Sequence, residues 1–152
     1  MRLVYSLSPA FCLVLASCSF TTATGFEECM SDSDCSKASA CLSRYCIKLP
    51  DGCTRVAGDF KDDDRIPFAA VLPLTTDSSG ARDESEYAGL NAFTQALDEM
   101  NQRMGANGRN FALHVCDTQR DETRASDQAK WMAEQLKVPV VLSSGSGQTI
   151  NI

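Results

Sequence analysis

The sequence predicts an α/β fold built on an incomplete, doubly wound parallel sheet and preceded by a small disulfide-rich module. From Ile66 onward, short apolar runs alternate with segments of helical periodicity, which is typical of parallel strands joined by crossover helices. Before that point apolar residues are sparse and cysteines are closely spaced, so the loops need covalent links to hold their shape. We therefore expect a Cys-rich module over residues 29–56, a polar linker over 57–65 and the α/β part over 66–152.

The N-terminus has the features of a targeting segment. Residues 1–17 contain a positive Arg2, then an apolar run and then small residues, which is the layout of a secretory signal peptide. Leu15-Ala16-Ser17-Cys18 resembles the lipobox of bacterial lipoproteins, which implies cleavage before Cys18 and acylation of that residue. The acyl chains would anchor the exported protein to a membrane, at the periplasmic or cell-envelope face, with residues 18–28 as a tether. The alternative is an ordinary signal peptide with a chance cysteine.

The charge of the chain limits its partners. The formal net charge is −6 and the pI is near 4.7, whereas binding to a nucleic-acid backbone needs clustered Lys and Arg. We therefore expect no nucleic-acid partner. After the N-terminus no long apolar run occurs, so no membrane-spanning helix is expected. The acidic run Asp62–Asp64 lacks the spacing and the glycine of a calcium-binding EF-hand, and we interpret it as a solvated surface.

The cysteines behind the tether predict disulfides rather than a metal site. An exported chain meets an oxidising compartment, zinc prefers closely paired cysteines, and no histidine lies nearby. Five cysteines between residues 29 and 53 cannot all pair among themselves, and the sixth lies far away. Our hypothesis is two bridges within the first four and one between the last two, although the sequence cannot choose among the possible connectivities. In chain order they are Cys29, Cys35, Cys41, Cys46, Cys53 and Cys116. No metal or other cofactor is expected.

The first strand and helix of the α/β part are expected over residues 66–74 and after Asp83. The run IPFAAVLPL predicts a buried strand, and Asp83 with Glu86 three residues later fits a capping box. Apolar residues then recur at spacings of three and four, which defines one helical face, before Gly105 ends the helix. These residues, all interpreted as core packing, are Leu90, Phe93, Leu97, Met100 and Met104.

The remaining elements continue the alternation. Residues 110–116 predict a second strand, Asp121 a cap for the second helix, residues 138–142 a third strand, and residues 147–149 the start of a third helix. The apolar face of the second helix consists of Ala125, Ala129, Met132 and Leu136. Three strands with one uncovered side cannot bury a full core, which is why we describe the sheet as incomplete.

Little in the α/β part points to catalysis. His114 is the one histidine of the chain, no Ser-His elbow is present, and a strand histidine without a special role is the favoured interpretation. Asp117 and Asp121 resemble a carboxylate pair only superficially. Trp131 lies one residue off the apolar face, so we expect it to be half-exposed or covered by the Cys-rich module. The protein is not expected to be an enzyme.

The loop that follows the third strand is the main candidate for binding. In a parallel sheet, ligands bind at the carboxyl ends of the strands, which here precede residues 73–80, 117–120 and 143–147. The phosphate-binding and dinucleotide-binding glycine motifs are both incomplete at Gly145 and Gly147. At a helix N-terminus, free N–H groups favour an anion such as a carboxylate, although a helix-capping loop without a ligand would look the same. The hydroxyls in this loop belong to Ser143, Ser144 and Ser146.

In their order and spacing, these motifs resemble the start of a type I periplasmic ligand-binding protein, and in particular the branched-chain amino-acid receptors of ABC transporters. The resemblance covers about residues 66–152 and excludes the Cys-rich module. The matching positions are Leu72-Pro73-Leu74-Thr75, Gly89, Asn101, Asn107-Gly108-Arg109, Asp117, Asp121, Thr123, Ala125, Ser146 and Thr149.

The resemblance implies a periplasmic-binding-protein-like I fold, in which two α/β lobes close on a ligand and the first lobe has the strand order 2-1-3-4-5. Ser146 then lies where the family binds the ligand's carboxylate, with Ser144 as a fallback and Thr149 beside it. Arg82 falls near the position where leucine-binding members carry a Trp, so the resemblance leaves an acidic or otherwise polar ligand open beside a branched-chain apolar one. The chain would be an N-terminal fragment of a longer receptor or a truncated gene product.

These observations lead to one functional hypothesis and one alternative. The first is a lipid-anchored extracytoplasmic receptor that delivers a small polar ligand, an amino acid, to the permease of an ABC transporter. The alternative is an anchored sensor or protein-interaction module, in which the Cys-rich region binds a partner and the lobe acts as a receiver.

Overall fold

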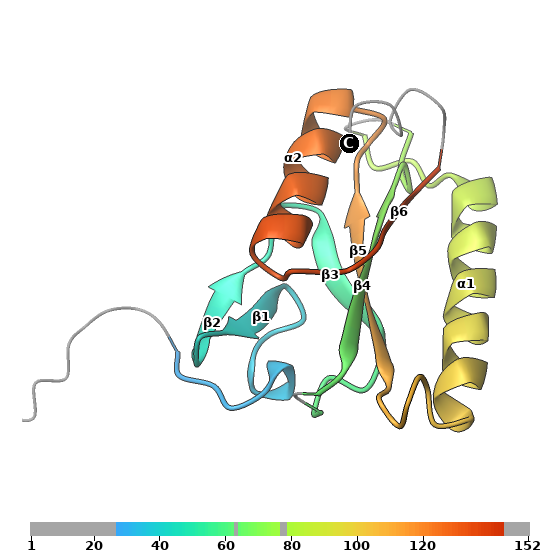
Figure 1. Cartoon of the computed structure of the whole chain (residues 1–152). Helices are drawn as coiled ribbons and strands as arrows, with labels where there is room; N and C mark the ends of the chain where they lie inside the picture. Colours follow the sequence, from blue (N-terminus) through green and yellow to red (C-terminus); the bar gives the residue numbers. More distant parts are fainter. Residues whose placement is uncertain (1–26, 63, 77–78, 145–152) are drawn as a thin grey trace, which may run out of the picture.

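The computed structural model describes residues 27–62, 64–76 and 79–144. Within them, a four-stranded sheet of order β3-β5-β4-β6 lies between two helices, and a separate two-stranded hairpin lies beside it (Figure 1). The helices α1 and α2 lie on opposite sides of the sheet, which confirms the predicted α/β class. The elements of this layered part are β3 (Cys53–Gly58), β4 (Ile66–Leu72), α1 (Glu84–Gln102), β5 (Phe111–Asp117), α2 (Glu122–Glu134) and β6 (Val141–Ser143).

The three predicted strands pair in parallel with the first of them in the middle. β4 pairs with β5 on one side and with β6 on the other, so the first, second and third strands follow the order 2-1-3 that the family resemblance implies. β6 begins at Val141 rather than at residue 138 as predicted. Pro139 lacks the N–H group that a strand ladder needs, which explains the later start.

The fourth strand, β3, is the main departure from the expected sheet. It pairs antiparallel with β5, so that Cys53 lies opposite Cys116 and the sheet is mixed rather than wholly parallel. The boundary expected between residues 56 and 57 falls inside this strand. The Cys-rich segment therefore contributes a strand to the sheet, in addition to lying against it.

Acidic side chains start both helices. The carboxylate of Asp83 accepts hydrogen bonds from the backbone N–H groups of Ser85 and Glu86, and Asp121 accepts one from Arg124, as predicted for caps. The Glu86 carboxylate, expected to complete a capping box, instead accepts a hydrogen bond of 2.6 Å from the hydroxyl of Ser144. This contact links the start of α1 to the end of β6.

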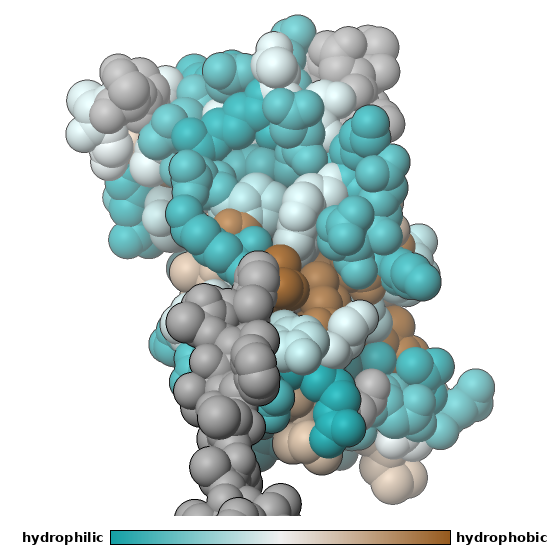
Figure 2. Space-filling view, turned by 90° about the vertical axis from the view of Figure 1, so that its left-hand side faces the viewer, coloured by the Kyte–Doolittle hydropathy of each residue, from teal (hydrophilic) through white to brown (hydrophobic). Residues whose placement is uncertain are grey.

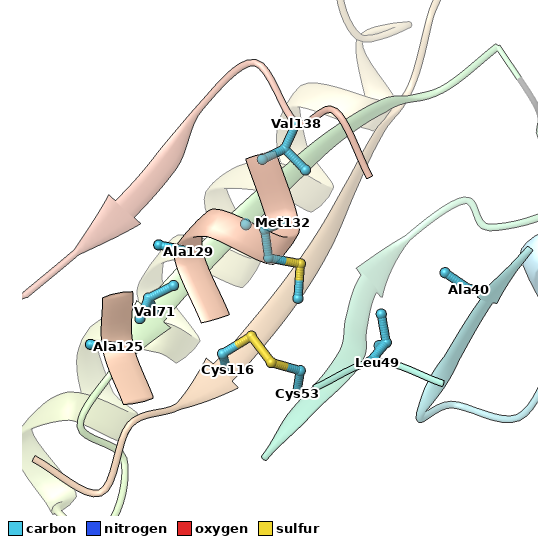
Figure 3. Packing of buried hydrophobic residues seen from close by; sticks show 10 residues of the cluster. Ala40, Leu49, Cys53, Val71, Cys116, Ala125, Ala129, Met132 and Val138 are labelled. Carbon is cyan, nitrogen blue, oxygen red and sulfur yellow. A yellow bond between two sulfur atoms is a disulfide. The ribbon is translucent and has the colours of Figure 1, made fainter. Parts of the chain in front are cut away.

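A separate apolar core lies on each side of the sheet. The core on the α2 side includes the Cys-rich residues Ala40 and Leu49 (Figure 3), and Trp131 packs half-buried against it. The Cys-rich segment thus covers part of this side. The other core residues there are Cys53, Ala69, Val71, Cys116, Ala125, Ala129, Met132 and Val138. The core on the α1 side contains Ala70, Leu74, Leu90, Leu97, Phe111, Leu113 and Val115.

Two methionines predicted in the core are exposed. Met100 has a relative exposure of 41% and Met104 of 74%. α1 ends at Gln102, and Met104 has a left-handed backbone with φ of 67°, so it no longer follows the helical period. The predicted apolar face is therefore correct only for its first three members, Leu90, Phe93 and Leu97.

Three disulfides hold the Cys-rich segment, in agreement with the hypothesised pairing. Cys29 is bonded to Cys41 and Cys35 to Cys46, around the hairpin β1 (Ser39–Leu42) and β2 (Tyr45–Lys48) and the short 3-10 helix η1 (Asp32–Asp34). Cys53 is bonded to Cys116, which joins β3 to β5. Within the described residues, neither α-helix combines the length and the apolar character of a membrane span.

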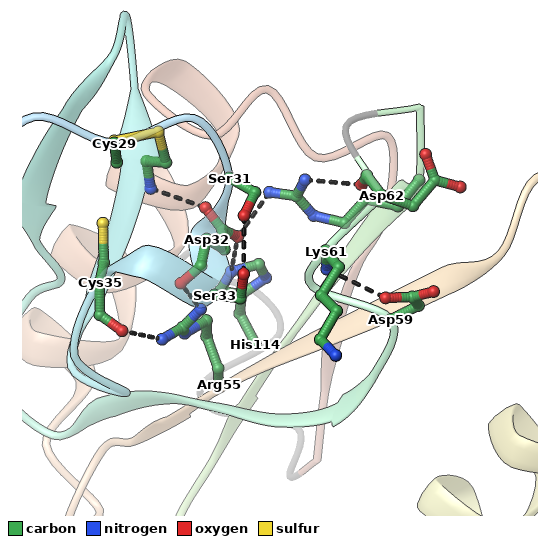
Figure 4. Close-up of polar contacts among 12 residues, drawn as sticks. Cys29, Ser31, Asp32, Ser33, Cys35, Arg55, Asp59, Lys61, Asp62 and His114 are labelled. Carbon is green, nitrogen blue, oxygen red and sulfur yellow. Dashed lines mark hydrogen bonds and ion pairs between the residues drawn. A yellow bond between two sulfur atoms is a disulfide. The ribbon is translucent and has the colours of Figure 1, made fainter.

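A buried polar cluster completes the junction between the Cys-rich segment and the sheet (Figure 4). We call Asp32, Arg55, Arg65 and His114 the Asp32 cluster. The Asp32 side chain is fully buried, pairs with Arg65, and accepts a hydrogen bond of 2.6 Å from the backbone of Cys41. Arg55 donates to the carbonyl groups of Asp32, Cys35 and Ser36. His114 has its Nε2 3.8 Å from Asp32, so it takes part in this junction and is not an isolated strand histidine.

Candidate ligand-binding site

The carboxyl ends of the three parallel strands meet at one edge of the sheet. β4, β5 and β6 run in the same direction and end at Leu72, Asp117 and Ser143. The residues that follow them come from three separate loops. In parallel sheets this edge is where ligands bind, because loops and helix N-termini gather there.

Asp117 fixes two of these loops to each other. Its Oδ1 accepts hydrogen bonds from the backbone N–H of Thr75 at 3.1 Å and of Gln119 at 3.0 Å, and its Oδ2 accepts from the Thr75 hydroxyl at 2.7 Å. Both oxygens are therefore occupied within the protein. Asp117 shapes the edge, and the superficial pair with Asp121 does not form, because Asp121 caps α2.

Arg82 is held at the same edge with its guanidinium accessible. Its guanidinium carbon lies 3.7 Å from the centroid of the Tyr87 ring, and its Nε lies 3.4 Å from a Glu84 oxygen. The side chain remains 52% exposed. A cation on an aromatic face is positioned by the ring without losing its charge. The structure thus places the predicted Arg82 at the edge and adds Tyr87 as its support.

Asp83 and Arg120 form a second link across the edge, which the sequence analysis missed. Arg120 donates to Asp83 Oδ2 at 2.7 Å, while Asp83 Oδ1 caps α1. Hydrogen bonds from the Ser85 hydroxyl and from Arg120 lower the pKa of Asp83 to about 2. The two residues are 37 positions apart, so no local signal in the sequence points to their contact.

Ser144 is the predicted binding residue that the structure does describe. Its Oγ is half-buried and donates to Glu86, so the hydroxyl proton is already used within the protein. Ser146 and Thr149, as well as the third helix predicted from residue 147, lie outside the described residues, and so does the predicted lipidation site Cys18. Of the predicted ligand-binding residues, Ser144 and Arg82 are therefore the two that can be located.

A small cavity opens beside Ser144, between α1 and the strands β4 and β6. It has a volume of about 170 Å³ and is walled by apolar side chains. Glu86 and Ser144 supply its polar groups. The lining residues are Ala70, Leu72, Glu86, Gly89, Leu90, Phe93, Leu142 and Ser144.

A larger hollow lies away from this edge, where the Cys-rich segment meets the sheet. It has a volume of about 510 Å³ and is lined partly by Met30, Leu42, Arg44 and Leu136. Figure 2 shows the face that carries the Cys-rich segment, with hydrophobic surface in its middle between more polar parts. This hollow shares no lining residue with the cavity beside Ser144.

The fold and this edge define a class of protein, namely α/β lobes that bind a ligand at the carboxyl ends of parallel strands. A family model for periplasmic binding proteins matches residues 71–151, just over half of the 152 residues, and the chain belongs to this family. Membership implies a solute-binding role and an extracytoplasmic location, and members are generally not enzymes. No curated protein and no solved structure matches the chain. The disulfide-bonded segment from Cys29 to Cys46 lies outside the matched range.

Proposed function

We propose that the protein is a lipid-anchored receptor that binds a small polar ligand, an amino acid, and delivers it to the permease of an ABC transporter. The observation that carries this proposal is the gathering of polar side chains from three loops at the carboxyl edge of the sheet. Arg82 and Ser144 lie there, and membership of the periplasmic binding protein family supports a solute as the ligand.

The ligand's carboxylate is proposed to bind at Ser146, with Thr149 beside it. In the sequence these residues come three and six positions after the end of β6, where a helix N-terminus would favour an anion. Titration calorimetry of the full-length mature protein with a panel of amino acids tests the proposal. Ser146→Ala is expected to weaken the binding of a carboxylate ligand by about 1.5–3 kcal/mol, which is the contribution of a hydrogen bond to a charged group.

The control for this experiment is Ser36→Ala, which removes an exposed hydroxyl in the Cys-rich segment. It is expected to leave the affinity unchanged. An unchanged affinity in Ser146→Ala would remove that residue from the site. If no small molecule binds while a protein partner does, the alternative of a sensor or interaction module replaces the transport proposal.

The proposed lipid anchor has its own test. Acylation at Cys18 predicts that labelled palmitate is incorporated into the wild-type protein in cells and is lost in Cys18→Ser. Cys12→Ser is the matched control, because Cys12 lies inside the proposed signal peptide and should not affect labelling. Labelling that persists in Cys18→Ser would show that the anchor is attached elsewhere.

A further inference from the structure

The contact between Ser144 and Glu86 determines what this end of the site can recognise. A carboxylate accepts hydrogen bonds and cannot donate them, so the Ser144 hydroxyl is the donor in the 2.6 Å contact. The remaining lone pairs of Ser144 Oγ and of both Glu86 oxygens are acceptors. A ligand group that binds here has to donate hydrogen bonds, which a ligand carboxylate cannot do.

The charge of Glu86 has no counter-ion among the described residues. The two nearby acids at the start of α1 already have cationic partners. Glu84 lies 3.4 Å from Arg82, and Asp83 lies 2.7 Å from Arg120. In the described part of the chain, the carboxylate of Glu86 accepts a hydrogen bond from Ser144, and no lysine or arginine forms an ion pair with this carboxylate. The site therefore offers a negative charge for a cation.

The cavity beside Glu86 and Ser144 favours a cation that carries an apolar chain. Its walls include Leu72, Phe93 and Leu142, and its volume of about 170 Å³ is below the ~300–1,000 Å³ of pockets for drug-sized ligands. Gly89 also lines the cavity, and a Cβ placed there would meet no atom within 4 Å, so the space at this position is open. A short chain fits this space, and a large group does not.

We propose that Glu86, Ser144 and this cavity bind a primary ammonium group that carries a short apolar chain. An ammonium group has three donors and no acceptor, which matches the acceptors offered by Glu86 and Ser144. This inference rests on the proposed function as a solute receptor. It assigns Ser144 to the cationic end of the ligand instead of the carboxylate, and it makes an amino acid with an apolar side chain a suitable ligand.

The experiment is titration calorimetry of the full-length mature protein with n-butylamine and with n-butyrate, which have the same number of carbon atoms and opposite charges. We expect binding of the amine and at least about 10-fold weaker binding of the acid. Glu86→Gln keeps the shape of the side chain and removes the charge, so it is expected to lower the affinity for the amine by about 10-fold or more. Asp98→Asn, which removes the charge of an exposed acid elsewhere on α1, is the matched control and is expected to have no effect.

Gly89→Leu provides an independent test, because Gly89 lines the cavity, an added Cβ there meets no atom within 4 Å, and leucine favours a helix. It is expected to abolish amine binding without lowering the unfolding midpoint. Equal affinity for amine and acid, or unchanged amine binding in Glu86→Gln or Gly89→Leu, would overturn the inference. A lower unfolding midpoint in Gly89→Leu, together with no amine binding to the wild type, would show that another polypeptide segment fills the cavity, which also overturns it.

The same titrations separate this inference from the proposed function. If amino acids bind in a manner that depends on Ser146, but amine binding and the Glu86→Gln effect are missing, the receptor function stands and the ammonium site is wrong. If neither amino acids nor n-butylamine bind, both proposals are contradicted.

Discussion

Asp32 is a fully buried carboxylate that receives hydrogen bonds from two different parts of the chain. Arg65, which precedes β4, pairs with it, and the backbone of Cys41 donates to it from the hairpin. A buried ion pair contributes little net stability, but removal of one partner costs several kcal/mol because a charge is left uncompensated. The Asp32 cluster therefore acts mainly to specify how the Cys-rich segment lies on the sheet.

His114 makes the stability of this junction dependent on pH. Burial lowers the pKa of His114 from 6.5 to about 4, with Arg65 and Arg55 acting in the same direction and Asp32 opposing them. At a pH between these two pKa values, His114 binds a proton in the unfolded chain but not in the folded protein. The free energy of unfolding should therefore fall by roughly 3 kcal/mol as the pH decreases from 6.5 to 4, and change no further through this residue below that.

Urea denaturation across this pH range checks the prediction. His114→Leu removes the titrating group, so its profile should be flatter over the same interval, whatever its absolute stability. Parallel profiles for the wild type and His114→Leu would show that other groups cause the pH dependence.

At the scale of single elements, the glycines of α1 and of the turn that follows it have opposite roles. Gly89 lies inside α1, and an added Cβ there meets no atom within 4 Å. Gly89→Ala should stabilise the protein by about 0.5–1 kcal/mol, because alanine loses less backbone entropy in a helix. Gly105 has φ of 59°, and a Cβ there collides with the carbonyl of Arg109, so Gly105→Ala should destabilise the protein.

Thermal unfolding of the two variants measures this difference. The midpoint is expected to rise for Gly89→Ala and to fall for Gly105→Ala. A fall in both variants would mean that the open space at Gly89 is needed for folding.

The elements that could be predicted from the sequence are those with local signals. Asp83 and Asp121 cap helices through N–H groups two or three residues away, and β4 and β5 are continuous apolar runs. β3 could not be predicted, because it contains the polar Thr54 and Arg55 and depends on pairing with a strand more than 50 residues later. Pairing of this kind leaves no periodic pattern in the short strand itself.

In the candidate site, too, features with local sequence signals could be predicted, and contacts between distant residues could not. Its location was predictable, since the alternation of strands and helices places three loops at one edge. The contacts within it were not, because Ser144 meets Glu86 across 58 residues and Arg120 meets Asp83 across 37. The position of Ser144 at this edge follows from its place directly after β6, whereas the donation of its hydroxyl proton to Glu86 depends on a contact between distant residues.

At the scale of the whole molecule, the three disulfides of the described residues differ in how much chain they enclose. Cys53 and Cys116 are separated by 63 residues, whereas Cys29 and Cys41 are separated by 12. Loop-closure entropy predicts that the free energy of unfolding falls by about 4 kcal/mol in the double variant Cys53→Ala/Cys116→Ala. In Cys29→Ala/Cys41→Ala it should fall by about 3 kcal/mol. Denaturant unfolding of the two double variants gives both values, and a larger loss in the second would contradict the entropic account.

The antiparallel pairing of β3 with β5 also determines the order in which the molecule can mature. A chain that is exported N-terminus first presents Cys53 to an oxidising environment well before Cys116, which follows 63 residues later. During that interval β3 has no partner strand, whereas Cys29, Cys35, Cys41 and Cys46 are already able to pair. In such a chain the bridge between Cys53 and Cys116, which joins the Cys-rich segment to β5, becomes possible later than the two bridges within that segment.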